Sequence, residues 1–368
     1  MYTPKLLIHP NVRLKRERAL PVKGSALFKV GDFVGAHEDV LVTELKGDLS
    51  IVKIAERLGI SPDEAMSGVL VKEGQELYEG DLIFRKKGLF GFFEESVFSP
   101  VSGVVEFISK ESSHIGIRSK PERLSVSAYL PGTVSSVTSD RVVEISSRVG
   151  VLQGVFGKGA EGFGVICFLP VKRDQIIEKS DLVDIDNDLD GVIVAGGASI
   201  SEEAFSVLCE RRTLGIVTAS LSSRFVRGVL GGLGEAKRGG STPVVMITEG
   251  FGFLPMSEKA FAILKNNDGK KASISGKTQV RAGAIRPELI FHDPDLSVSE
   301  ISEDRTSQLL PGDMVRVVRG KNFGKIGKII DAPRQMQVLE SGVNARCLLL
   351  QLEKGEKEMV ALANLESV

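Results

Sequence analysis

The chain has 368 residues, with 47 Lys and Arg against 48 Asp and Glu, and a formal net charge of -1 at pH 7. This length suggests two or three domains, and a hydrophobic content of 42% excludes a wholly disordered protein. The balanced charge excludes a protein that binds nucleic acid through a basic surface spanning the whole chain, so any such contact must be local. The 40 glycines follow no collagen period and indicate many tight turns between short strands.

The cysteines and the hydropathy indicate the cellular compartment in which the protein is expected. Cys167, Cys209 and Cys347 are far apart and form no CxxC pair, which excludes a zinc ribbon and a disulfide framework. The first residues lack the apolar core of a signal peptide, and no uncharged apolar run is long enough to span a bilayer. We therefore expect a cytoplasmic protein with reduced thiols and no inserted membrane segment.

The first half of the chain is predicted to be mostly β. Residues 1–24 contain six basic residues against one acid and are predicted to form a basic N-terminal arm. Residues 25–175 consist of short β-like runs with glycines between them, and we expect one β domain there. A helical insertion near residues 50–67 is predicted, because Ile51–Leu58 has helical apolar spacing and Ser61–Glu64 has the order of a capping box.

Residues 176–292 change character, since apolar strand candidates alternate there with helix candidates. The expected strands are Gly191–Ala195, Leu214–Thr218 and Pro243–Ile247, and the expected helices follow Ser201, cover Arg224–Leu230 and cover Ser257–Lys265. Such alternation is typical of a parallel sheet with helices on its faces. The sequence therefore predicts a small α/β domain with a parallel sheet.

The C-terminal segment contains the most specific motif. After a linker over residues 293–310 that is rich in acids, residues 311–368 are predicted to form a separate β module. Gly312–Gly327 alternates apolar and polar residues and then turns on glycines. This pattern resembles the KOW motif of large-subunit ribosomal proteins and transcription-elongation factors, and Met359–Glu366 resembles the closing strand of that module. The resemblance implies a small SH3-like β-barrel.

In the KOW family, the loop between the first strands often contacts RNA or a protein. Here the predicted contact residues are Arg316, Arg319, Lys321, Phe323 and Lys325. Cations suit phosphates, and an aromatic ring suits stacking on a base of single-stranded RNA. The module has nine basic and seven acidic residues, so its charge leaves both RNA contact and protein docking open.

A second resemblance lies in the first half of the chain. Val69–Ile83 resembles the strand-turn-strand of biotinyl and lipoyl domains, and Ser99–Glu106 resembles a later strand of the same fold. The resemblance implies a barrel-sandwich hybrid, but the modified lysine of those carriers has no counterpart, so no covalent cofactor is expected. The loop tip is apolar instead and is predicted to be a docking loop, unless it folds back onto a neighbouring domain. Its large residues are Leu89, Phe90, Phe92 and Phe93.

The predicted parallel sheet offers a candidate ligand site. Gly196 and Gly197 follow one apolar strand, and Glu249 lies at the end of another. Ligands of open α/β sheets bind at the carboxyl ends of the strands, so these three residues are candidates for a small phosphorylated ligand. No catalytic partner accompanies Glu249, and Arg286 is expected to pair with Glu249 or Glu288.

The sequence thus predicts a multidomain α+β protein with a barrel-sandwich β domain, a small α/β parallel-sheet domain and a C-terminal SH3-like β-barrel. We expect a non-enzymatic binding or scaffold protein whose partner is RNA, a ribonucleoprotein or a protein of a transcription-linked or translation-linked assembly. No cofactor and no metal site is predicted. An enzyme or sensor with a small phosphorylated ligand and a structural protein-docking oligomer remain the alternatives. The oligomeric state is not predicted.

Overall fold

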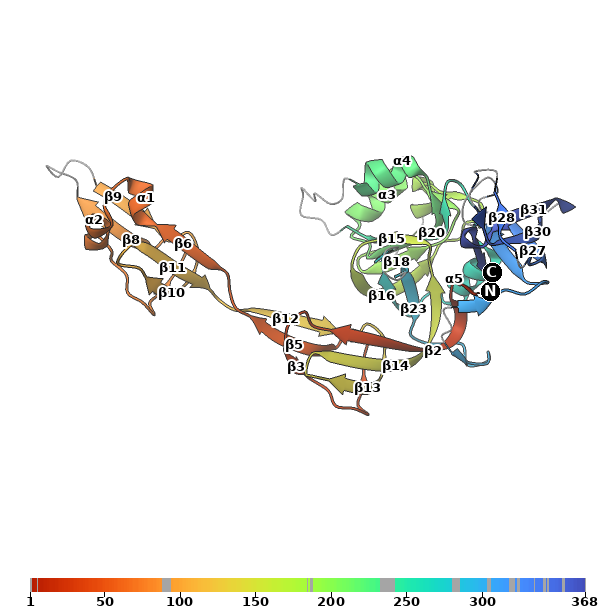
Figure 1. Cartoon of the computed structure of the whole chain (residues 1–368), viewed down its shortest axis with the longest axis horizontal. Coiled ribbons are helices and arrows are strands. Elements are labelled where there is room, and N and C mark those ends of the chain that lie inside the picture. Colours follow the sequence, from red (N-terminus) through yellow and green to blue (C-terminus); the bar gives the residue numbers. More distant parts are fainter. Residues whose placement is uncertain are drawn as a thin grey trace.

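The protein is elongated, with a small head at one end and a larger body at the other (Figure 1). The computed structural model describes residues 2–4, 6–87, 94–183, 185, 188–231, 242–279, 285–302, 306–317, 322, 325–333, 335–339, 342, 344–352 and 355–367. These residues are mostly β, distributed over several sheets with a minority of helix. Within these ranges, no helix combines the length and the hydropathy that crossing a membrane requires.

The head, residues 46–121, has a hydrophobic core of its own. A four-stranded antiparallel sheet in the order β6-β11-β10-β7 lies beside the β8–β9 hairpin and two short helices. The bounds are β6 Leu49–Lys53, α1 Ile54–Leu58, α2 Pro62–Ser67, β7 Glu76–Leu77, β8 Leu82–Lys87, β9 Glu94–Phe98, β10 Gly103–Ile108 and β11 His114–Ser119. All members of its buried core lie between Val52 and Ile117.

The helical insertion predicted near residues 50–67 is present as α1 and α2. Gly59 ends α1 with a φ of 66°, a left-handed conformation that glycine adopts without strain. Ser61 caps α2, since its side chain accepts a hydrogen bond from the Glu64 backbone N–H. The Glu64 carboxylate also pairs with Lys86 of β8, which joins α2 to the hairpin.

A stem joins the head to the body. It consists of β3 Ser25–Ala26, β4 Phe33–Val34, β5 Asp39–Leu45, β12 Glu122–Ser127 and β13 Gly132–Thr138. β5 and β12 pair in antiparallel fashion, with Leu45 opposite Glu122 at the end that meets the head. A buried core that includes Leu20, Val40, Leu130 and Ile145 fills the stem. The head therefore connects to the body through a two-stranded ribbon that continues this stem (Figure 1).

Two long strands continue from the stem into the body. β2 Ile8–Ala19 and β14 Val142–Gln153 pair along almost their full length, and the end of β14 also pairs with β23 Glu288–Phe291. The basic N-terminal segment, expected to be an arm, instead forms β2. Its cations meet acids from distant segments, because folding places β2 along β14 and beside β24. These pairs are Arg13 with Glu300, Lys15 with Glu144, Arg16 with Glu288 and Arg18 with Glu161.

The central sheet of the body has the order β15-β21-β20-β18-β16-β22-β23-β14, and β16, β18, β20 and β21 are parallel neighbours. Its strands are β15 Phe156–Lys158, β16 Glu161–Phe168, β18 Val192–Ala195, β20 Gly215–Leu221, β21 Val244–Phe251, β22 Lys271–Ser275 and β23. The covering elements are η2 Lys179–Leu182, α3 Glu202–Glu210, α4 Ser223–Phe225, η3 Val226–Leu230 and α5 Glu258–Asn266, and β17 Ile176–Ile177 pairs with β19 Ser199–Ile200. Separate hydrophobic cores fill the two faces, as the alternating pattern predicts.

The boundary of this α/β unit differs from the prediction. β15 and β16 were assigned to the first β domain, but β16 pairs with β18 and β22 in the central sheet. The alternation of residues around Phe163 predicts a strand and does not identify its partner. The partners of β16 follow it in the chain, and only their packing decides the sheet in which it lies.

The C-terminal module, residues 311–367, is a five-stranded antiparallel sheet in the order β31-β30-β27-β26-β32 around its own core. Its elements are β26 Met314–Val317, β27 Ile326–Asp331, β28 Gln337–Val338, β29 Asn344–Ala345, β30 Cys347–Leu352, β31 Lys357–Ala361, η5 Leu362–Asn364 and β32 Leu365–Ser367. Before it, β24 Ile301–Ser302 pairs with β2, and β25 Thr306–Gln308 pairs with β1 Tyr2–Pro4.

The predicted barrels are not closed in the described residues. In the C-terminal module, β31 and β32 are the two edges of the sheet, and η5 leads the chain from one edge to the other without a ladder between them. In the head, a single bridge between Val69 and Phe84 links the hairpin to the segment after α2. The C-terminal module is an open sheet, and the head is an open four-stranded sheet beside a hairpin; each has a filled core.

Candidate functional site

The C-terminal module contacts the body through a cluster of buried charges. Arg316 of β26 forms an ion pair with Glu249 of β21, with 2.6 Å between Nη1 and Oε2, and their side chains are 8% and 6% exposed. Glu366 of β32 lies directly opposite Arg316 in the module's sheet and pairs with Arg286 of the body at 2.9 Å. Each ion pair therefore joins one residue of the module to one residue of the body.

Local structure explains why these charges are buried. Arg316 of β26 lies between Val315 and Val317, and these three residues are all buried. Burial raises the pKa of the Glu366 carboxyl above its usual value, and the negative charge of Glu249 raises it further, against the opposing effect of Arg286 and Arg316. Buried charges are tolerated when they are paired. The cluster therefore holds the module against the body.

Both carboxylate oxygens of Glu249 have partners within the protein. Its Oε1 accepts hydrogen bonds from the Ser257 backbone N–H at 2.9 Å and from the Thr248 hydroxyl at 3.2 Å, and its Oε2 contacts Arg316. Ser257 is also the N-cap of α5, so the carboxylate joins the end of β21 to the start of that helix. This arrangement positions two elements and a neighbouring module, which is a structural task.

Gly196 and Gly197 lie at the same end of the sheet as Glu249, with β20 between them, as parallel pairing predicts. The turn is closely packed. Gly197 has a φ of 63°, and a Cβ there would lie 2.9 Å from the Gln175 carbonyl oxygen. Its own carbonyl accepts hydrogen bonds from the Ala219 backbone N–H and the Thr218 hydroxyl. The ligand role predicted for Gly196, Gly197 and Glu249 stays a prediction, and the contacts described here are those of a packed turn.

The predicted RNA or partner contacts are only partly described. Arg319, Lys321 and Phe323 lie outside the described residues. Lys325 is exposed, and its Nζ lies 3.8 Å from Glu356 in a pair with side chains 48% and 65% exposed. Exposed pairs of this kind contribute little stability, so Lys325 stays accessible to an anion. The docking loop predicted at Leu89, Phe90, Phe92 and Phe93 also lies outside the described residues.

Sequence reasoning missed the charge cluster. Arg286 was expected to pair with Glu249 or Glu288, but it pairs with Glu366, while Glu288 pairs with Arg16. The sequence contained one signal of this cluster, the single charge of Arg316 inside the apolar strand β26, because a buried charge requires a partner. It could not identify that partner. Among the described side chains, no three His, Cys, Asp or Glu residues come together in a group that could hold a metal ion.

Comparison with known proteins bears on the C-terminal module alone. Residues 311–339 match the family model described as the KOW motif, which confirms the resemblance expected from Gly312–Gly327. The match covers β26, β27 and β28 and includes Arg316 and Lys325. A comparison with curated proteins finds no match to the chain. At the level of the motif, the chain is linked to binding in RNA-associated and ribosome-associated systems.

Proposed function

We propose that this protein is a non-enzymatic binding protein that contacts RNA through its C-terminal module and presents its head as a second docking unit. The observation that supports this most directly is the KOW motif at residues 311–339, which includes the exposed Lys325. Cations in such a module suit the phosphates of RNA, and the predicted ring of Phe323 suits base stacking.

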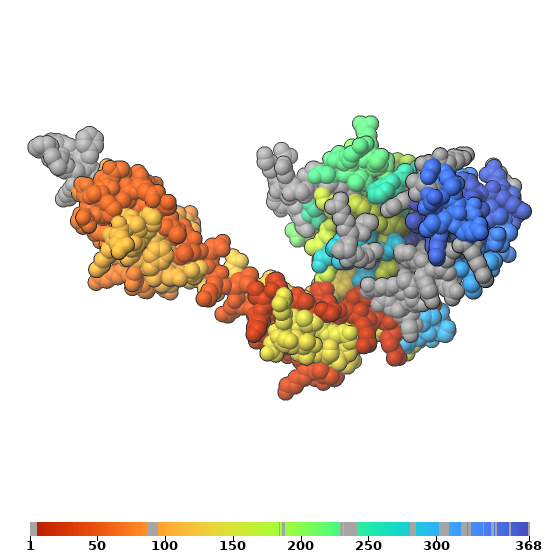
Figure 2. All heavy atoms as spheres, in the orientation of Figure 1, coloured from red at the N-terminus to blue at the C-terminus, as the bar shows by residue number. Residues whose placement is uncertain are grey.

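The arrangement of the modules fits a scaffold. Figure 2 shows the head and the C-terminal module at opposite ends of the molecule, with a narrow connection between the head and the stem. The buried pairs Glu249–Arg316 and Arg286–Glu366 join the C-terminal module to the body, so we expect these two parts to move together. A protein with this shape holds two partners apart at a defined separation. We infer that the partner at the C-terminal end belongs to a transcription-linked or translation-linked assembly.

Fluorescence anisotropy of the full chain with labelled single-stranded RNA tests the proposal. Lys321→Glu and Lys325→Glu should each weaken binding about tenfold, and each should lower the slope of log K against log salt by about 1, because each removes a phosphate contact. Lys265→Glu on α5, also an exposed lysine, is the control and should leave both quantities unchanged.

Two results would contradict the RNA proposal. One is wild-type protein that binds no RNA at low salt. The other is a binding curve that the Lys265→Glu control changes as much as Lys325→Glu does. In either case, docking of the module to a protein becomes the better account of the KOW motif, and cross-linking from position 325 would identify that partner.

A further inference from the structure

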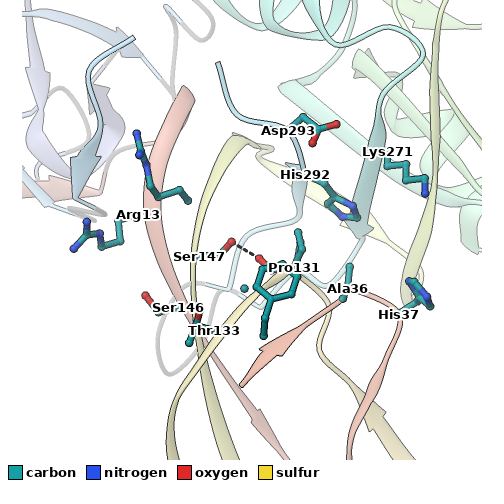
Figure 3. A pocket seen from close by; sticks show the side chains of 14 residues that line it. Arg13, Ala36, His37, Pro131, Thr133, Ser146, Ser147, Lys271, His292 and Asp293 are labelled. Carbon is teal, nitrogen blue, oxygen red and sulfur yellow. Dashed lines mark hydrogen bonds between the residues drawn. The ribbon is translucent and has the colours of Figure 1, made fainter. Parts of the chain in front are cut away.

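A cleft of about 690 Å³ opens where the stem meets the central sheet (Figure 3). We call it the joint cleft. One side is a sheet face made by β2, β4, β13 and β14, and another is made by residues at the ends of β22 and β23. Its lining includes Arg13, Phe33, Thr133, Ser146, Arg148, Lys271, His292 and Asp293. Neither the KOW motif nor the charge cluster at Glu249 includes any of them.

The sheet face presents an aromatic ring and two hydroxyls in one cross-strand row. Phe33 of β4 lies opposite Thr133 of β13, which lies opposite Ser146 of β14. Residues in such a row point to the same face. Phe33 is 71% exposed, the highest fraction among the large apolar side chains of the described chain. Phenylalanine side chains are usually buried, so an exposed ring beside a polar cleft is unusual. The exposed ring provides a surface on which another planar ring can stack.

The next row on the same face is cationic. Arg148 of β14 lies opposite Arg13 of β2, two residues along from Ser146. Their Nε atoms lie 2.7 Å (Arg13) and 2.5 Å (Arg148) from the two oxygens of Glu300. Two guanidinium groups that share one carboxylate keep one positive charge uncompensated. The two rows are about 7 Å apart, a separation that a nucleotide can span between its base and its phosphate.

The opposite side of the cleft adds a third cationic side chain. Lys271, at the start of β22, is exposed and has no ion pair within the part of the chain that the structure describes. Asp293 is the acid that lines the cleft, so Lys271 and the Arg13–Arg148 pair leave the lining with a net positive charge. Figure 3 shows Lys271 and His292 on a different side of the cleft from Thr133 and Ser146. An anionic ligand would therefore meet cations from three strands, on two sides of the cleft.

His292 supplies a neutral hydrogen-bonding group. Its Nε2 lies 2.7 Å from the Ser273 hydroxyl, and that hydroxyl donates to the Tyr129 carbonyl. The Ser273 oxygen must therefore accept the proton of Nε2–H, which leaves Nδ1 as an acceptor. Burial lowers the pKa of His292 to about 4, so the imidazole is neutral at pH 7. Neutral Nδ1 suits a hydroxyl donor such as a sugar hydroxyl.

We propose that the joint cleft binds a nucleotide unit, with its base stacked on Phe33 and its phosphate held by Lys271 and the Arg13–Arg148 pair. The cleft combines a ring for stacking, a row of hydroxyls and several cations. A site for a simple anion would not need the ring, and an apolar site would not need the cations. The same chemistry fits a free mononucleotide and one residue of a single-stranded RNA. The proposal does not depend on RNA contact by the C-terminal module.

Isothermal titration of the full chain with AMP, adenosine and inorganic phosphate tests the two halves of the site. AMP should bind more tightly than either fragment, because only AMP has both the ring and the phosphate. Phe33→Ala should weaken AMP binding about fivefold to tenfold through lost stacking, and Lys271→Met should weaken it about tenfold through a lost charge-assisted contact. Both side chains are exposed, so the variants should keep the wild-type melting temperature.

Matched controls separate the cleft from other surfaces. Phe253→Ala removes another exposed ring, 57% exposed, and Lys265→Met removes another exposed lysine. Neither variant should change AMP affinity, and Lys325→Glu in the C-terminal module should not change it either. A failure of the RNA proposal at Lys325 would therefore leave this test intact.

A labelled oligoadenylate distinguishes the two sources of the ligand. Tighter binding of the oligomer than of AMP, lost in Phe33→Ala, supports single-stranded RNA as the ligand, and the reverse order supports a free nucleotide. Absence of binding of both AMP and the oligomer at millimolar concentration overturns the proposal. Binding that Phe33→Ala and Lys271→Met leave unchanged, or that the controls weaken equally, also overturns it.

Discussion

Glu249 of β21 and Arg316 of β26 form a buried ion pair, with 2.6 Å between Oε2 and Nη1, that joins the central sheet to the C-terminal module. From the sequence we expect separate functions for these two residues, Glu249 as a ligand contact and Arg316 as a contact to RNA or a protein partner. The structure brings them together, and Arg286 and Glu366 form a second pair across the same boundary. The C-terminal module is therefore held in one orientation on the body.

The first prediction concerns this pair. Arg316→Met should destabilise the protein by about 3 kcal/mol, because it leaves the Glu249 carboxylate buried without its cation. The double variant Glu249→Gln, Arg316→Met should recover part of the loss, since it removes both charges. Urea denaturation followed by circular dichroism measures the difference. Lys53→Met, which removes an exposed pair with Glu56, is the control and should leave the stability close to that of the wild type. An Arg316→Met protein as stable as this control would contradict the structural role.

The second prediction concerns the glycine turn. Gly197→Ala should destabilise the protein by about 1–3 kcal/mol, because residue 197 has a φ of 63° and its Cβ would lie 2.9 Å from the Gln175 carbonyl oxygen. Gly228→Ala is the control, since a Cβ at that position would lie more than 4 Å from every described atom outside the neighbouring residues and the helix's own backbone. Thermal melting of both variants checks the prediction, and equal melting temperatures would refute it. A loss of ligand binding in a Gly197 variant can be interpreted only after this measurement.

The third prediction concerns the head. Its core lies between Val52 and Ile117, and the chain enters and leaves through Leu45 and Glu122, which are opposite neighbours. Replacing residues 46–121 with an Asn-Gly turn should therefore give a folded protein, because that turn suits a two-residue hairpin. Calorimetry should show the loss of one unfolding transition while the transition of the body stays in place. RNA affinity should also be unchanged. A truncated protein that fails to fold would show that the head stabilises the stem.

The fourth prediction is a pH dependence at His292. Burial lowers its pKa in the folded protein from the usual 6.5 to about 4. Between these values the unfolded chain binds more protons than the folded one, so this residue makes stability fall as the pH falls from 6.5 towards 4. His292→Gln should show a smaller loss across that window. Parallel urea titrations at several pH values decide between these outcomes, and identical slopes for wild type and His292→Gln would contradict the prediction.

Local features of the fold could be predicted from the sequence. The cap at Ser61, the apolar strands β18, β20 and β21 and the helix after Ser257 all appear where the residues indicate them. The KOW motif in residues 311–339 was also predictable, since its glycines and its alternation lie within one short segment. Each of these signals depends on residues that are close in sequence, which is why a single chain reveals them.

The partners of these segments could not be predicted in the same way. β16 has the pattern of a strand in either domain, and only β18 and β22, which follow it in the chain, place it in the central sheet. From the sequence alone, the cations of β2 indicate a basic arm. In the structure they pair with acids that are distant in the chain, such as Glu288 and Glu300. The joint cleft combines residues from Arg13 to Asp293, so no local motif contains it.

Local patterns thus reveal the strands β18, β20 and β21, the helix caps at Ser61 and Ser257 and the KOW motif. The tertiary structure alone decided which buried charges are paired, where the modules join and where a cleft opens. The physical reason is that backbone propensity and hydrophobic alternation act between near neighbours. The energy of a buried charge such as Arg316 depends instead on a partner, Glu249, that only the folded chain brings within 2.6 Å.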